Sequence, residues 1–176
     1  LDPLASGLLP ICLGEATKLS GLLLNADKTY QFTCRLGVTT ATGDAEGEIL
    51  ATRPVGPLSR EEVEAALRRF TGAIQQTPPM YSALKRNGQP LYKLARKGIE
   101  VERAPREVMI RDLRLLRLDG EELECALRCS KGTYVRTLAA DLGETLGCGA
   151  HIVALRRTAV EPYDAARMVT PETLHE

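Results

Sequence analysis

VMIRDLRLLRLDGEELECALRC, residues 108–129, is the stretch of this chain that decides its fold class. Residues 108–118 and 122–129 flank Asp119-Gly120, a dipeptide that is a strong signal for a two-residue hairpin turn. In the second half, every other residue is apolar, which is the period of a strand with one buried face. We therefore predict an antiparallel hairpin whose second strand turns four residues toward the core: Leu123, Cys125, Leu127 and Cys129.

A second clear strand is predicted at residues 28–36, where apolar and polar residues alternate strictly. Tyr30, Phe32, Cys34 and Leu36 share the apolar side of this strand. Tyr30 is then either an ordinary core tyrosine or a ring that borders a pocket at the end of the strand. Shorter strands are expected at residues 48–52 and around Leu155.

Four helices are predicted between these strands. One follows the capping box Ser59-Arg60-Glu61-Glu62 and ends near Gly72. The others are expected at residues 15–24, 90–98 and 130–147. Strands outnumber helices and include a hairpin, so we predict an α+β domain with a mixed, mainly antiparallel sheet flanked by helices and loops.

Composition limits the classes of function that the chain can have. Of its 176 residues, 44% are hydrophobic and 26% are charged, as in soluble globular proteins. No apolar run is long enough to span a membrane, and no signal-peptide pattern is present. The five cysteines include no Cys-x-x-Cys pair and the chain has only two histidines, so we expect no metal, no disulfide framework and a cytoplasmic location.

Charge is unevenly distributed although the net charge is zero. Residues 85–117 contain ten basic and four acidic side chains, whereas residues 1–50 contain three basic and six acidic ones. The middle of the chain is therefore either a surface that binds a polyanion or an ordinary solvated charged face.

Asp2 lies in an otherwise apolar opening segment. A residue before proline is disfavoured in the helical region, and Pro3 has its own φ fixed. A carboxylate on so stiff a loop suits a nucleophile, although an Asp-Pro pair also commonly starts a turn. Further along, Lys131, Tyr134 and Arg136 cluster at a predicted strand-to-helix junction, a reasonable place for an anion.

The ordered set of these motifs resembles one family. Residues 1–18, LDPLASGLLPICLGEATK, are similar to the catalytic motif of the pseudouridine synthases, and most closely to the bacterial TruB type, the tRNA pseudouridine-55 synthases. Further segments match the same family across essentially the whole chain: residues 27–30, 36–47, 78–85, 129–137, 147–151 and 155–157.

The resemblance implies a role for each matching position. Asp2 is the aspartate that attacks the target uridine, Tyr30 stacks on the flipped base and takes a proton, and Arg136 pairs with Asp2. Tyr134 and Leu155 line the base pocket, while Lys131, Lys85 and the basic residues around them meet phosphates of the tRNA T arm. The reaction that the resemblance implies needs no cofactor. The sequence gives no evidence of a protein partner, and we expect a monomer.

The resemblance also implies a domain organisation. We expect one catalytic domain over residues 1–176, truncated at its N-terminus, with a basic RNA-binding segment at about 78–106 and without the family's small C-terminal PUA-like RNA-binding domain. The family carries a glycine-histidine stretch directly before the Leu-Asp-Pro, and here the sequence starts at Leu1.

Two other functions remain open from the sequence. One is an RNA-binding module in which Asp2 is structural. The other is a hydrolase of a glycosidic bond, which needs a second acid, and Glu15, Asp44 and Glu46 are available. Within the favoured function, attack of Asp2 on C6 of uracil and attack on C1′ of ribose are equally compatible with the sequence.

Overall fold

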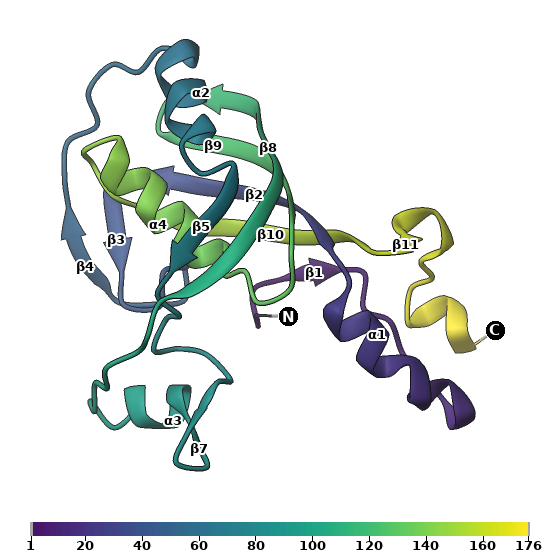
Figure 1. The fold of residues 1–176 in the computed structure, drawn as a ribbon. Coiled ribbons are helices and arrows are strands. Elements are labelled where there is room, and N and C mark those ends of the chain that lie inside the picture. The colour runs from purple at the N-terminus through teal and green to yellow at the C-terminus, as the bar shows by residue number, and fades with distance from the viewer. Residues whose placement is uncertain (1, 176) are drawn as a thin grey trace.

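The computed structural model describes residues 2–175, and a seven-stranded sheet organises them (Figure 1). The strand order is β1-β10-β2-β9-β8-β5, with the short β11 paired to β10. Neighbours are antiparallel except β1 and β10, which are parallel, so the predicted mixed, mainly antiparallel sheet is confirmed. The bounds are β1 Ser6–Gly7, β2 Lys28–Leu36, β5 Gly72–Gln76, β8 Arg106–Asp119, β9 Glu122–Cys129, β10 Ala150–Val160 and β11 Tyr163–Asp164.

The predicted hairpin forms the β8–β9 pair. Asp119 pairs with Glu122, so the turn consists of Gly120 and Glu121 and lies one residue later than the sequence pattern suggested. Gly120 has a φ of 58°, a left-handed conformation that glycine adopts without strain. The predicted inward face of β9 is confirmed, since its apolar residues are all at most 1% exposed: Leu123, Cys125, Leu127 and Cys129.

Two helices cover one face of the sheet and complete the core. α2 (Arg60–Arg68) and α4 (Val135–Thr145) contact β8 and β10 respectively and also contact each other. The predicted capping box of α2 is present: the Ser59 hydroxyl accepts from the Glu62 amide, and the Glu62 carboxylate accepts from the Ser59 amide. The prediction that Gly72 ends this helix is wrong, because α2 ends at Arg68 and Gly72 opens β5.

The predicted helix at residues 15–24 is present as a 3₁₀ turn, Gly14–Leu19, followed by α1, Ser20–Asn25. Neither segment buries a residue among those the structure describes, and Leu22 is 69% exposed. Within residues 2–175, no helix combines the length and the hydropathy needed to span a membrane. Two further 3₁₀ turns, Ala165–Arg167 and Glu172–His175, lie near the end of the chain.

Two small hairpins form sheets of their own, and the first of them lies against β10 of the main sheet. β3 (Val38–Thr40) and β4 (Ile49–Thr52) flank the polar loop at residues 41–48. β6 (Lys85–Arg86), β7 (Gln89–Pro90) and α3 (Leu91–Ala95) belong to residues 82–105, which we call the basic lobe. Figure 1 shows this lobe projecting away from the sheet, in the part of the chain between β5 and β8.

Candidate active site

Asp2 occupies the first position of a tight turn at the edge of the sheet. Its carbonyl oxygen accepts from the Ala5 amide at 2.9 Å, and Pro3 takes the second position of the turn, where a fixed φ is favourable. The turn interpretation of Asp-Pro is therefore correct for the backbone. It does not decide the role of the side chain, which points to another part of the chain.

β1 fastens this turn to the sheet. The Leu8 amide donates to the Arg157 carbonyl at 2.8 Å, and Nε of Arg157 donates back to the Leu8 carbonyl at 2.8 Å. Gly7 has a φ of 98°, and a Cβ at this position would lie 2.1 Å from the Arg157 carbonyl oxygen. Only glycine permits β1 to approach β10 so closely, and this approach holds the Asp2 turn in place.

Arg136 makes a two-point contact with the Asp2 carboxylate. Nε of Arg136 donates to Oδ2 at 2.8 Å, and Nη2 donates to Oδ1 at 3.0 Å. The Arg136 side chain is 7% exposed and that of Asp2 is 30% exposed. This bidentate geometry is the strongest form of the arginine–carboxylate pair, and it leaves one face of the carboxylate open to a ligand.

The rest of the Arg136 guanidinium is also satisfied. Nη1 donates to the Thr42 carbonyl at 2.8 Å and Nη2 donates to the Tyr81 carbonyl at 2.7 Å. Arg136 lies in the first turn of α4, and three segments that are distant in sequence supply its acceptors. Its orientation is fixed by backbone as well as by side-chain acceptors.

Asp44 is a second carboxylate beside Arg136, and its Oδ2 lies 3.6 Å from Nη1. It is 3% exposed, and its Oδ1 accepts from the Thr42 hydroxyl at 2.5 Å and from the Glu46 amide at 3.1 Å. The sequence pattern gave Asp44 only as one of three available acids. Its place in the middle of a turn-rich loop that matches the family was the sole signal for it.

Tyr30 lies in β2 opposite Leu127 on one side and Arg157 on the other, and it packs against the core. Burial raises the pKa of the Tyr30 hydroxyl above its ordinary value, Cys129 adds to that rise, and the adjacent Arg157 opposes it. The Asp2 carboxylate makes the smallest contribution, and it also raises the pKa of Tyr30.

The remaining predicted residues lie at different distances from this centre. Tyr134 directly precedes α4. Leu155 is 6% exposed and, with Leu4 of the Asp2 turn, lines a groove of about 400 Å³. Lys131 is exposed and donates to Oδ1 of Asn25 at 2.6 Å, and Lys85 is exposed in β6 of the basic lobe. Neither lysine is among the hydrogen-bond partners that the described chain gives to Asp2 or Arg136.

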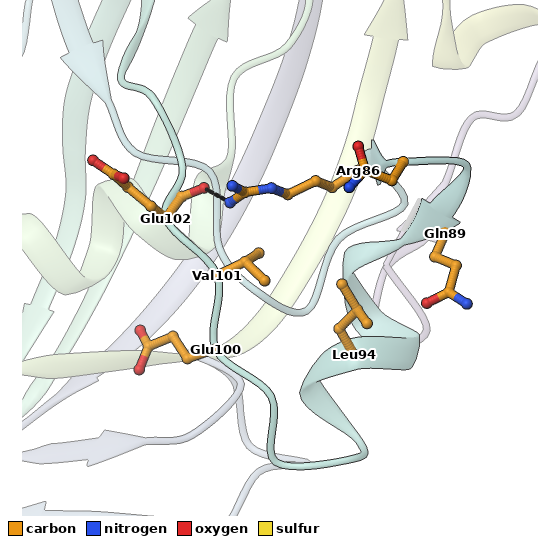
Figure 2. A pocket seen from close by; sticks show the side chains of 7 residues that line it. Arg86, Gln89, Leu94, Glu100, Val101 and Glu102 are labelled. Carbon is orange, nitrogen blue, oxygen red and sulfur yellow. Dashed lines mark hydrogen bonds between the residues drawn. The ribbon is translucent and has the colours of Figure 1, made fainter.

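The basic lobe carries a hollow of its own, of about 610 Å³ (Figure 2). Arg86 reaches across it and donates to the Glu102 carbonyl at 2.6 Å, as the dashed line in Figure 2 marks. Polar and charged side chains line most of it: Arg86, Asn87, Gln89, Glu100 and Glu102, with Leu94 and Val101. The described residues that line this hollow offer hydrogen-bonding groups, but they form no bidentate arginine–carboxylate pair like that of Asp2 and Arg136.

Four of the five cysteines are buried, and Cys12 is half-buried. All five are free thiols, and burial raises the pKa of Cys129 to about 11 and that of Cys125 to about 12. Thiols with so high a pKa stay protonated and are poor nucleophiles. Within residues 2–175, no group of three or more His, Cys, Asp or Glu side chains is arranged to hold a metal ion.

Comparison with known families identifies the class to which this fold and site belong. The model described as "TruB family pseudouridylate synthase (N terminal domain)" matches residues 1–135, and that described as "tRNA pseudouridylate synthase B C-terminal domain" matches residues 136–176. The chain is thus of the pseudouridylate synthase class. Within that class it belongs to the TruB family, as the resemblance of its motifs predicted.

Curated relatives agree with this assignment. The tRNA pseudouridine synthase B of Nitrosococcus oceani is 62% identical over 174 residues, and that of Chromobacterium violaceum is 63% identical over 159 residues. These alignments cover 99% and 90% of this chain but 56% and 52% of the relatives, so the chain spans about half their length.

Solved structures support the predicted fold. A Cbf5-Nop10-Gar1 complex contains a chain that matches with a TM-score of 0.70 and 28% identity, over 93% of this chain and 39% of that one. A chain of an H/ACA RNP bound to a substrate RNA containing 2'-deoxyuridine matches with a TM-score of 0.64 at 24% identity, again over 93% of this chain, and shows the fold alone. The predicted pseudouridine-synthase fold is therefore confirmed.

Proposed function

We propose that the protein converts a uridine of tRNA to pseudouridine, with Asp2 as the nucleophile. The carrying observation is the bidentate pair of Asp2 and Arg136, held at the sheet edge in a chain of the TruB family. In this reaction the C1′–N1 bond of the nucleotide breaks and a C1′–C5 bond forms. N1 gains a proton and C5 loses one, so the net change is an isomerisation that needs no redox partner or group donor.

Arg136 suits the role of orienting this nucleophile. Its guanidinium stays protonated at any working pH and offers the Asp2 carboxylate two donors at once. Because Asp44 and two carbonyl groups also hold Arg136, the guanidinium keeps its position if Asp2 moves toward a substrate. Asp2 is the more exposed member of the pair, so it is the member that a bound nucleotide can reach.

A nucleotide in a folded tRNA loop must leave its stack before Asp2 can reach it. The flipped base then needs an aromatic surface and an apolar wall. We assign these roles to Tyr30, whose pKa responds to Asp2, to Tyr134, which lies two residues before Arg136, and to Leu155. Tyr30, whose raised pKa keeps the hydroxyl protonated at neutral pH, stacks on the base and takes part in the proton transfer between C5 and N1.

The basic lobe provides the approach surface for RNA in this proposal. It holds six basic and two acidic side chains, and Lys85 lies on its exposed hairpin. Lysine and arginine that contact phosphates supply sequence-independent affinity and make binding salt-dependent. We assign Lys85 and Lys131 to phosphates of the T arm, the target to the T-loop uridine at position 55, and the protein to the cytoplasm.

A glycosidic-bond hydrolase is a weaker alternative. Such an enzyme needs one carboxylic acid that stays protonated and a second that is ionised. The two acids at this site, Asp2 and Asp44, both lie beside the same Arg136 guanidinium, so neither has the apolar surroundings of a proton-donating acid. The side chains of Glu15 and Glu46 are exposed, and neither is among the hydrogen-bond or ion-pair partners that the described residues give to Asp2 or Arg136.

The proposal is tested with the protein at its full natural length and an unmodified tRNA transcript. Pseudouridine is mapped along the transcript after incubation with the wild type and with Asp2→Asn. We expect pseudouridine at the T-loop uridine with the wild type and none with Asp2→Asn. A free uracil base in the products would favour the hydrolase. Tight binding without any product would favour the RNA-binding module, and an equally active Asp2→Asn would refute the assigned mechanism.

A further inference from the structure

The buried amide of Gln76 makes a reciprocal contact with the backbone just before α4. Oε1 of Gln76 accepts from the Tyr134 amide at 3.0 Å, and Nε2 donates to the Tyr134 carbonyl at 3.3 Å. Gln76 is 2% exposed and is the last residue of β5. A side-chain amide thus pairs with a residue 58 positions away in the manner of a neighbouring strand.

Tyr134 is the residue that sets the start of α4. It is the N-cap position with an extended backbone, and Arg136 follows in the first helical turn. No side-chain cap hydrogen bond supports this helix start. The Tyr134 carbonyl also accepts from the Leu138 amide at 3.1 Å, so Gln76 adds a second donor to it. Gln76 Oε1 satisfies the Tyr134 amide, which precedes the first helical turn, and in this way holds the start of α4.

The chain that follows Gln76 touches the same place again. Five residues later, the Tyr81 carbonyl accepts from Nη2 of Arg136 at 2.7 Å. Residues 76–81 form a strap that holds the helix backbone at Tyr134 and the guanidinium of Arg136 at once. The strap continues directly into the basic lobe at residue 82.

We propose that Gln76 is a positioning residue for Arg136. Its two hydrogen bonds set the backbone at the start of α4, and this setting aligns Nε and Nη2 of Arg136 with the Asp2 carboxylate. The inference rests on the proposed function for its consequence in catalysis, but the alignment itself is a property of the free protein.

The physical reason for a large effect is geometric. A bidentate arginine–carboxylate contact requires both nitrogen–oxygen distances to be met together, so a small shift of the helix start weakens both bonds. Displacing a group by about 1 Å at a reacting centre can cost roughly 100-fold in rate. Loss of the Gln76 amide is therefore expected to act on the chemical step and to leave the RNA-binding lobe intact.

The test compares Gln76→Met with Gln75→Met. Methionine keeps the length and apolar packing of glutamine but makes neither hydrogen bond, and Gln75 is the exposed neighbour on the same strand. At saturating tRNA and a temperature where both variants are folded by circular dichroism, we expect Gln76→Met to slow the single-turnover rate about 10- to 100-fold. Affinity for tRNA is expected to stay at the wild-type value, and Gln75→Met to behave as wild type.

Two further variants keep the test decisive. Gln76→Leu also removes both hydrogen bonds and keeps an apolar side chain of similar size, so the same loss of rate is expected, and this variant replaces Gln76→Met if that one fails to fold. In an Arg136→Ala background, Gln76→Met should cause no additional loss, because both changes remove one alignment. An undiminished additional loss, or a fall in affinity parallel to the fall in rate, would overturn the proposal.

A measurement without substrate separates this inference from the proposed function. The Nε–H resonance of Arg136, which is protected by Oδ2 of Asp2, is expected to exchange faster with solvent in Gln76→Met than in Gln75→Met. If the wild type makes no pseudouridine, this resonance decides the inference alone. Equal protection in the two variants would refute it.

Discussion

The Asp2–Arg136 centre and the basic lobe are built in opposite ways. The centre draws on residues near positions 2, 42–44, 81 and 136, and each polar group of Arg136 has a defined acceptor. The lobe is a continuous stretch with mostly exposed side chains, and Leu91 and Ser82 are its buried residues in the described structure. One region is fixed by hydrogen bonds between distant segments, and the other is a charged surface on a short local scaffold.

This difference matches the two tasks proposed for the protein. A reacting carboxylate needs fixed partners, because preorganised charges cost no rearrangement when the reaction occurs. Contacts to phosphates act through charge and tolerate small displacements. Substitutions in the centre should therefore change rate more than affinity, and substitutions in the lobe should change affinity more than rate.

Arg136→Ala is expected to have the largest effect. It leaves the buried Asp44 without its cation and Asp2 without its two donors, so single-turnover rate should fall roughly 1,000-fold, or about 4 kcal/mol. Affinity for tRNA should change little, as measured by filter binding. Asp44→Asn serves as the companion variant: it keeps the shape of the acid and should reduce the rate less, since the Asp2 pair is retained. Equal loss of rate and affinity in Arg136→Ala would make Arg136 a phosphate contact.

Gly7→Ala and Gly88→Ala compare how closely the backbone is packed beside the Asp2 turn and in the basic lobe. A methyl group at Gly7 meets the Arg157 carbonyl in a left-handed conformation, so strain and overpacking should lower the free energy of unfolding by about 2–4 kcal/mol. Gly88→Ala in the lobe also has a positive φ, but a Cβ there meets nothing within 4 Å. It should cost only about 1 kcal/mol. Denaturant titration measures the free energy of unfolding of both variants. A smaller loss for Gly7→Ala than for Gly88→Ala would contradict the close approach of β1 and β10.

Alkaline pH should weaken the sheet beneath the centre. Because burial raises the pKa of Cys129 from 9.0 to about 11, the folded state favours its protonated thiol. The contribution of this protonated thiol to the free energy of unfolding is fully present below pH 9 and is lost as pH rises toward 11. A pKa shift of this size corresponds to a change in the free energy of unfolding on the order of 2 kcal/mol. The lobe contains no cysteine. Unfolding free energy measured at successive pH values should fall less steeply in Cys129→Ala, and an unchanged slope would exclude this thiol as the cause.

The smallest effect is expected from charge removal in the lobe. Lys85→Gln combined with Lys97→Gln should weaken tRNA binding a few-fold and lower the slope of log affinity against log salt by about 0.7–0.9 per lost phosphate contact. The rate at saturation should not change. Lys18→Gln, an exposed lysine paired with Glu15 outside the lobe, is the matched control and should leave the salt slope unaltered.

Local patterns predicted most of the fold. The alternation in residues 28–36 and 122–129 and the capping box at Ser59 depend on neighbouring residues, and the structure has all three. The hairpin turn was placed one residue early because Asp119-Gly120 is a turn signal that does not fix the strand register. The exposure of Leu22 could not be predicted, since an apolar helix face does not specify what covers it.

The pattern of residues was less informative about the site. Arg136 and Asp2 were paired through a family resemblance, and that pairing is present. Two partners of Arg136, at Thr42 and Tyr81, are backbone carbonyl groups. Every residue type has such a group, so a sequence motif cannot predict which of them accept from Arg136. The Gln76 side chain also bonds to backbone groups, those of Tyr134. Because such bonds do not depend on the residue type at position 134, the sequence could not indicate this contact.

The central claim is that the Asp2–Arg136 centre performs the chemistry and the basic lobe provides affinity for tRNA. One single-turnover time course at saturating tRNA tests it most directly. Asp2→Asn and the Lys85→Gln/Lys97→Gln double variant are followed beside the wild type, with occupancy checked on the same samples. We predict that Asp2→Asn binds tRNA and forms no pseudouridine, whereas the double variant reaches the wild-type rate constant. Formation of pseudouridine by Asp2→Asn at the wild-type rate, or arrest of the double variant at full occupancy, would contradict the assignment of chemistry to the Asp2–Arg136 centre.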